Sequence, residues 1–288
     1  MKTQNQGPAA PYHVRLQAED GGLHLKLGEV WAYRDLVLLM TKKTFTMTYQ
    51  QTILGPLWII LNPVLSSLIY MFIFGHVAAI GTDGVPQILF YFLSSSVWGM
   101  FAYSLTSNAS TFVSNANLFG KVYFPRLVMP LSEMLVSCLR FLVQLAIVLV
   151  LLAIYAARGD VSPEWKYFFF LPFLFLQVSF LGMSAGVLLS SLTTRYRDLM
   201  HLVNIGVNLL MYGSAVVYPL SAIPEGPLRT LIRHNPVTGL MELIRRIMLG
   251  RGEADPGLYL GGLAFTALLF VLGTMIFNRV QRNFADTV

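Results

Sequence analysis

The segment 115–130 places a lysine, an arginine and two prolines between two long apolar stretches. Its Phe-Gly-Lys at 119–121 resembles the end of a phosphate-binding loop. A Walker A loop requires Gly-x-x-x-x-Gly-Lys-Ser/Thr, but Asn115 replaces the upstream glycine and Val122 replaces the hydroxyl residue. The segment therefore does not predict a nucleotide site.

The sequence also lacks two other catalytic or metal-binding patterns. It contains no His-Glu-x-x-His or Cys-x-x-Cys pattern, and its single cysteine, Cys138, cannot form an intrachain disulfide or a thiolate metal cluster. The five histidines are scattered: His13, His24, His76, His201 and His234. We predict no catalytic residue, no metal site and no cofactor held by this chain.

Glu133 and Arg140 are ionisable residues inside one apolar stretch. They are seven residues apart, which places them about two helical turns apart on nearly the same face. Ionisable residues inside a membrane normally face a protein interior or a pore. Arg140 is therefore expected in a polar pathway or subunit interface, or beside a structural partner elsewhere, whereas Glu133 also suits the headgroup level. A single acidic residue is too few for a proton relay, so any energy for transport must come from a partner.

The elements that carry these residues are predicted to be membrane-spanning helices. The chain has 288 residues, of which 55% are hydrophobic and only 12% charged, about half the usual charged fraction. Most of its charge-free stretches reach the roughly 20 residues that span a bilayer. We predict an all-α polytopic fold with six spans at about 53–80, 86–112, 127–157, 165–192, 200–220 and 257–279.

The distribution of basic residues predicts the orientation. Of the 20 lysines and arginines, twelve fall on the side of the two termini and seven on the other side, with Arg140 inside a span. Cytoplasmic loops carry the excess of positive charge. Both termini are therefore predicted to be cytoplasmic in an inner or plasma membrane. The net charge of +6 follows from this bias and does not indicate nucleic-acid binding.

Two further segments are predicted outside the spans. After a polar tail at 1–28, the residues Tyr33, Leu36, Val37 and Met40 recur at helical spacing, which predicts an amphipathic helix at 29–49 on the membrane surface, or one packed on another subunit.

Before the last span, Asn235 can cap a helix that begins at Pro236, and a shorter helix fits 224–234. Neither helix is long enough to cross, which predicts a re-entrant or surface pair. Its arginines then reach headgroups or a pore mouth, or complement helix C-termini.

Four stretches resemble one family, the permease subunits of ABC exporters that carry lipid-linked polysaccharides such as O-antigen, capsule and teichoic acid. They are YQQTILGPLWIILNP at 49–63, KVYFPR at 121–126, RYRDL at 195–199 and NPVTGLMELIRR at 235–246. Each motif is weak alone, but the ordered set is specific and runs from about residue 29 to the C-terminus.

The resemblance implies a homodimer, with a separate cytoplasmic ATPase subunit on each copy that binds the ATP and Mg absent from this chain. It implies a coupling helix for that ATPase at Asn115, Asn117, Leu118, Phe119, Gly120, Lys121 and Val122. Further ATPase contacts would be Tyr33, Arg34, Arg195, Arg197 and Asp198. An ordinary charged loop, with an Arg-Asp ion pair in the turn, explains the last three almost as well.

The substrate class implied is a polyprenyl-diphosphate-linked glycan, which requires aromatic faces for sugars and cations for the diphosphate. The aromatic candidates are Tyr70, Trp98, Tyr103 and Tyr212, and the cationic candidates are Arg140, Arg229, Arg233, Arg245 and Arg246. The alternatives are an exporter of a drug or small lipid, a polyprenyl-phosphate transferase, and a membrane scaffold. The transferase would need an acidic metal motif, which the sequence lacks.

Overall fold

A computed structural model describes residues 27–50, 52–115, 124–196 and 198–285. Within these residues the fold is entirely helical, as the sequence predicted. Arg197 and most of the predicted coupling segment, residues 116–122, lie outside the described residues. So does the predicted tail, apart from Leu27 and Gly28.

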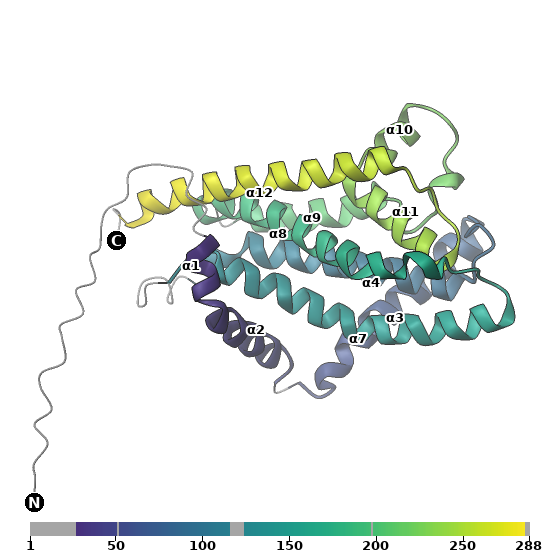
Figure 1. The fold of residues 1–288 in the computed structure, drawn as a ribbon, viewed down its shortest axis with the longest axis horizontal. Coiled ribbons are helices and arrows are strands. Elements are labelled where there is room, and N and C mark those ends of the chain that lie inside the picture. The colour runs from purple at the N-terminus through teal and green to yellow at the C-terminus, as the bar shows by residue number, and fades with distance from the viewer. Residues whose placement is uncertain (1–26, 51, 116–123, 197, 286–288) are drawn as a thin grey trace, which may run out of the picture.

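Five long helical segments lie side by side in one bundle (Figure 1) and are apolar enough to cross a membrane. Their bounds are Gly55–Val77, which comprises η1, α3 and the π-helical η2, Gln87–Ala109 (α4), Val128–Arg158 (α7), Trp165–Arg195, which comprises η3 and α8, and Pro256–Ile276 within α12 (Pro256–Ala285). These bounds agree with five of the six predicted spans to within a few residues.

The predicted span at 200–220 is shorter in the structure. Helix α9 covers Leu199–Tyr212, only 14 residues, so the predicted end at 220 is wrong. Pro219 has no N–H to donate to the carbonyl of Ala215 four residues earlier. That carbonyl instead accepts a hydrogen bond from Arg245, at 2.8 Å. The helix itself ends at Gly213, and Ala215 beyond it has a positive φ of 48°, so the chain has left the helical path before Pro219.

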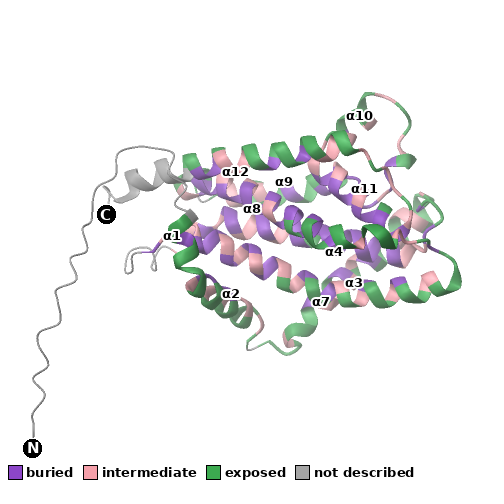
Figure 2. Ribbon diagram, viewed as in Figure 1, coloured by how far each residue is buried: buried purple, intermediate pink, exposed green. Residues whose placement is uncertain are grey.

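Helix α4 forms the centre of the bundle. In its most apolar stretch 72% of the residues are buried, against 17% for the first and last spans, and Figure 2 shows the same contrast between α4 and the largely exposed α12. Helix α8 packs closely on α4 because Gly182 and Gly186 face it. A Cβ atom at Gly182 would lie 2.6 Å from the carbonyl oxygen of Phe101, and one at Gly186 would meet that of Leu105. Small residues spaced in this way let two membrane helices approach.

Replacing Gly182 by alanine is expected to destabilise the protein by about 1–3 kcal/mol, because backbone atoms of α4 would have to move. The measurement is the thermal midpoint of the purified protein in detergent. Gly206→Ala on α9 is the matched control, since a Cβ there meets nothing within 4 Å. Equal midpoints for both variants would contradict the close α4–α8 contact.

The predicted helix at 29–49 is two helices, α1 (Leu27–Ala32) and α2 (Arg34–Tyr49). The predicted apolar stripe is directed at α7: Val37 is buried in a cluster with Val128 and Met129, and Leu36 and Met40 pack against it. Tyr33 is 38% exposed. A location on the membrane surface stays a prediction.

The two helices before the last span are α10 (Pro227–Arg233) and α11 (Pro236–Leu249). The predicted cap is confirmed, because Asn235 Oδ1 accepts from the N–H of Val237 at 3.0 Å. Helix α11 ends at Gly250, whose φ of 70° favours glycine. Its buried face belongs to the main hydrophobic core, so α11 lies inside the bundle. Helix α10 lies at the end of the bundle opposite α1 and the C-terminal part of α12 (Figure 1).

Candidate functional site

A polar cavity of about 180 Å³ lies between α3 (Trp58–Tyr70), α4 and α7. Four residues singled out in the sequence line it together: Tyr70, Trp98, Tyr103 and Arg140. Side-chain amides of Asn62 and Gln144 and the hydroxyls of Ser66, Ser95 and Ser137 complete the polar lining. Hydroxyls, amides, aromatic rings and one guanidinium therefore surround a single space at membrane depth.

One residue of the polar lining also satisfies a backbone carbonyl of α3 that has no helical donor. Pro63 inside this helix lacks an N–H, so the carbonyl of Ile59 has no helical donor. Gln144 on α7 donates to that carbonyl at 2.9 Å. Ser67 donates to the carbonyl of Pro63 and pairs with Ser95 on α4 at 3.1 Å. Pro63 thus leaves one acceptor on α3 that α7 satisfies, and the Ser67–Ser95 pair joins α3 to α4 nearby.

Arg140 is the cation of this cavity. Its guanidinium carbon lies 4.3 Å from the centroid of the Tyr103 ring, a cation–π arrangement. Among the described residues, Arg140 has no carboxylate within ion-pair distance. Glu133, predicted on nearly the same face, instead accepts from the Tyr103 hydroxyl at 3.2 Å. The guanidinium therefore carries a positive charge that no carboxylate of the described residues pairs with.

Tyr49 is a neighbour of Arg140 that the sequence reasoning missed. Burial raises the pKa of Tyr49, and the guanidinium of Arg140 acts in the opposite direction. The C-terminal end of α2 therefore lies close to the cavity. Tyr49 belongs to the resemblance motif at 49–63, which was the available signal, but its partner lies 91 residues further along the chain and no local spacing indicates it.

Three of the other candidate arginines lie on α10 and α11 and form ion pairs. Arg229 pairs with Glu253 at 2.5 Å, Arg233 with Asp255 at 2.9 Å and Arg246 with Glu164 at 2.6 Å. These arginines are 24 to 46% exposed at their side chains. They remain reachable from outside, but carboxylates already neutralise them and the structure does not bring them to the cavity of Arg140.

Arg245 is enclosed by the protein, with 1% of its surface exposed. It pairs with Glu242 at 2.9 Å and donates to Ser94 and to the carbonyls of Ala215 and Val216 at 2.7–2.8 Å. Its guanidinium also lies over the ring of Phe90. Every donor direction of this side chain is used within the fold. Arg245 therefore acts as a structural junction between α11, α4 and the segment after α9.

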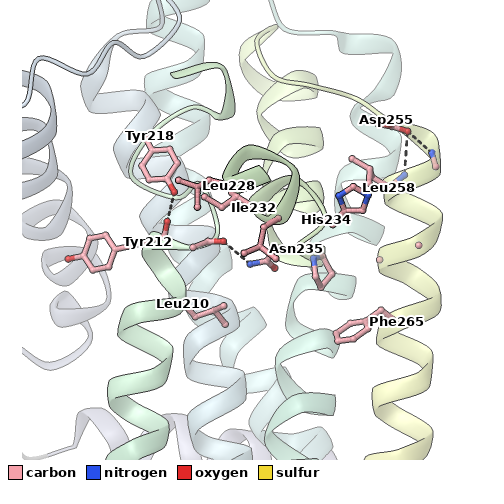
Figure 3. A pocket seen from close by; sticks show the side chains of 16 residues that line it. Leu210, Tyr212, Tyr218, Leu228, Ile232, His234, Asn235, Asp255, Leu258 and Phe265 are labelled. Carbon is pink, nitrogen blue, oxygen red and sulfur yellow. Dashed lines mark hydrogen bonds between the residues drawn. The ribbon is translucent and has the colours of Figure 1, made fainter. Parts of the chain in front are cut away.

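Tyr212 lies apart from the cavity, at the edge of a groove of about 1290 Å³ between α9, α10 and α12. Figure 3 shows that its ring points away from Ile232 and Leu228 of α10, and the Tyr218 hydroxyl donates to its carbonyl. The ring centroid lies 6.4 Å from that of Phe74, so Tyr212 faces the first span. The groove itself is mostly apolar.

The predicted ATPase contacts that the structure describes are exposed. Tyr33, Arg34, Arg195 and Asp198 all lie on the surface, and Asn115 follows the short helix α5 (Thr111–Ser114). Arg195 lies over the ring of Tyr196. Within the described residues it forms no ion pair with Asp198, so those two do not provide the alternative expected for this turn.

The cavity presents groups that anions and sugars commonly contact: an arginine without an acidic partner among the described residues, amide and hydroxyl groups, and aromatic faces. The part of the chain that the structure describes has no cluster of three histidine, cysteine or carboxylate side chains that could hold a metal.

Comparison with known proteins gives one family. The profile described as "ABC-2 type transporter" matches residues 35–249. The O-antigen export system permease protein RfbA of Klebsiella pneumoniae is 29% identical over 254 residues, which is 88% of this chain and 94% of that protein. The protein of the same name from Myxococcus xanthus is 27% identical over 261 residues, 90% of this chain and 98% of its own length.

Proposed function

This chain belongs to the ABC-2 type transporter family, and we propose that it exports a polyprenyl-diphosphate-linked polysaccharide across the cell membrane. It is a multi-pass membrane protein with at least five helices of spanning length. The relatives named as O-antigen export permeases align over nearly their whole lengths, which supports a polysaccharide as the cargo.

One observation carries the proposal furthest, namely the membrane-depth cavity that joins Arg140 to Tyr70, Trp98 and Tyr103. A diphosphate requires a cation, and a sugar requires aromatic faces and hydrogen-bonding groups. A guanidinium held over an aromatic ring, with no acidic partner among the described residues, meets the first requirement. The rings and the amides of Asn62 and Gln144 meet the second.

The working assembly in this proposal is a homodimer with two cytoplasmic ATPase subunits. The chain has no Walker A loop, so ATP and Mg bind to the partner. Residues 115–122 provide the coupling contact with the ATPase, and α2 provides a second contact. The packing of α2 on α7 gives a direct mechanical link between that contact and the helix that carries Arg140.

Substituting Phe119 and Lys121 by alanine is expected to uncouple ATP hydrolysis from export, because the proposed contact between the ATPase and this segment is lost. Glycan at the cell surface should fall by about tenfold or more, the effect of losing one well-packed contact of ~1.4 kcal/mol, while hydrolysis persists. The measurements are surface glycan and phosphate release by the purified complex. Lys166→Ala, on the predicted external side, is the control, and unchanged export in the double variant would contradict the coupling assignment.

The proposed cargo is tested by deleting the gene for this chain. Lipid-linked glycan should accumulate on the cytoplasmic face, and a plasmid copy should restore surface glycan. Normal surface glycan together with increased drug sensitivity would instead favour the exporter of a drug or small lipid. Loss of glycan transfer in membranes whose flow of lipid-linked precursor is intact would favour the transferase.

A further inference from the structure

The groove of about 1290 Å³ between α9, α10 and α12 has mainly apolar walls (Figure 3). Leu210 of α9 and Phe265 of α12 lie at one end of it. Leu228, His234 and Asp255 lie toward the other end. We call this space the α10 groove. Binding sites for small molecules usually have volumes of about 300–1,000 Å³, so the α10 groove is large enough for a lipid.

The apolar walls of the α10 groove are uncovered in the single chain. Leu228 and Leu231 of α10 are 62% and 72% exposed, and Phe265 of α12 is 44% exposed. A contiguous apolar surface on a protein normally marks the place where a lipid or another protein surface removes it from water. The α10 groove is therefore expected to hold an apolar ligand.

The length of the α10 groove matches the depth of one leaflet. Asp255 immediately precedes α12, and Phe265 lies ten residues further along the chain. A helix rises 1.5 Å per residue, so the groove extends about 15 Å along α12. The hydrocarbon core of a bilayer is about 30 Å thick. The acyl chains of one leaflet therefore span the same depth as the groove.

The polar end of the α10 groove carries both signs of charge. Asp255 lines this end and pairs with Arg233 at 2.9 Å, and the two side chains are 38% and 42% exposed. His234, which is exposed, also lines this end. A guanidinium can bind a phosphate while a carboxylate binds an ammonium group. The Arg233–Asp255 pair therefore complements a zwitterionic headgroup at the level where the acyl chains begin.

We propose that the α10 groove binds one zwitterionic phospholipid with an amine headgroup, such as phosphatidylethanolamine, from the leaflet on the side of α10. Its acyl chains lie along the leucines of α10 and the ring of Phe265. Its phosphate contacts Arg233 and its ammonium group contacts Asp255. The lipid fills the space between α10 and α12 and holds α10 against the bundle. This inference does not depend on the identity of the cargo, so it stands or fails separately from the proposed function.

The lipid retained by the purified complex tests this proposal. Gly261 of α12 lines the groove, and a Cβ atom there meets nothing within 4 Å, so Gly261→Trp places a large side chain in the groove. Leu260→Trp is the matched control, because Leu260 is 61% exposed and does not line the groove. Each complex is reconstituted in vesicles of equal parts phosphatidylethanolamine and phosphatidylglycerol, extracted into detergent and analysed by native mass spectrometry.

The wild type and Leu260→Trp should each retain one phosphatidylethanolamine per chain. Gly261→Trp should retain at least about tenfold less, because the indole occupies the space of the acyl chains. The smaller change Gly261→Leu should give an intermediate result. Asp255→Asn keeps a side-chain oxygen for the N–H of Gly257 but removes the charge. Its preference for phosphatidylethanolamine over phosphatidylglycerol should fall about twofold or more, as expected for one exposed ion pair.

Loss of all phospholipid from the wild-type complex would overturn the site. Equal retention by Gly261→Trp and Leu260→Trp would overturn its location in the groove. Equal retention of the two phospholipids by the wild type would overturn the headgroup assignment, and retention of a polyprenyl lipid would overturn the phospholipid. A disulfide between two Phe265→Cys copies, in a Cys138→Ser background, would show that a second copy of the chain covers the groove instead.

Discussion

Replacing Arg245 by methionine is expected to destabilise the protein by about 3–5 kcal/mol, the usual effect of removing one partner of a buried ion pair. Glu242 is 3% exposed and would lose its ion-pair partner inside the protein. The carbonyls of Ala215 and Val216 would lose their donors at the same time. The measurement is the thermal midpoint and the monodisperse yield in detergent.

Two companion variants make this prediction specific. Arg246→Met removes a half-exposed arginine one position away, paired with Glu164, and should change the free energy of unfolding by less than about 1 kcal/mol. Arg245→Met combined with Glu242→Gln should be more stable than Arg245→Met alone, because the unpaired buried charge is gone while the acceptor for the N–H of Glu253 remains. A stable Arg245→Met protein would show that this junction is dispensable.

Replacing Arg140 by glutamine is expected to abolish most export without unfolding the protein. In the proposed function its guanidinium binds the diphosphate, and a hydrogen bond to a charged group contributes about 1.5–3 kcal/mol. That loss corresponds to an export rate lower by about 10–100-fold. Surface glycan and the rate of export are the measurements, and phosphate release by the complex shows whether the ATPase still turns over.

Lysine at position 140 separates charge from shape. Arg140→Lys keeps the cation but not the planar fork that binds two phosphate oxygens, so export should fall between the wild type and Arg140→Gln. Arg158→Gln at the other end of α7 should export normally. If Arg140→Gln exports at the wild-type rate while remaining monodisperse, the cavity does not bind the anionic end of the cargo.

Local sequence predicted most of the long helices to within a few residues. Asn235 followed by Pro236 predicted the start of α11, and the structure has that cap because both effects act within one turn. Long apolar stretches predicted five helices that are long and apolar enough to span a bilayer, because both properties can be read along the chain. The end of α9 was missed because the hydrophobic stretch continues past Gly213, the residue at which the helix ends.

The sequence also indicated that Tyr70, Trp98, Tyr103 and Arg140 were worth attention, because polar and amphipathic residues inside apolar spans need partners. Only the tertiary structure showed that they line one cavity. It also showed that Gln144 donates to the carbonyl of Ile59, and that Arg245 is buried whereas Arg246 is exposed. The physical reason is that hydropathy and helical period act along the chain, whereas burial and hydrogen bonding are decided by residues that lie far apart in it.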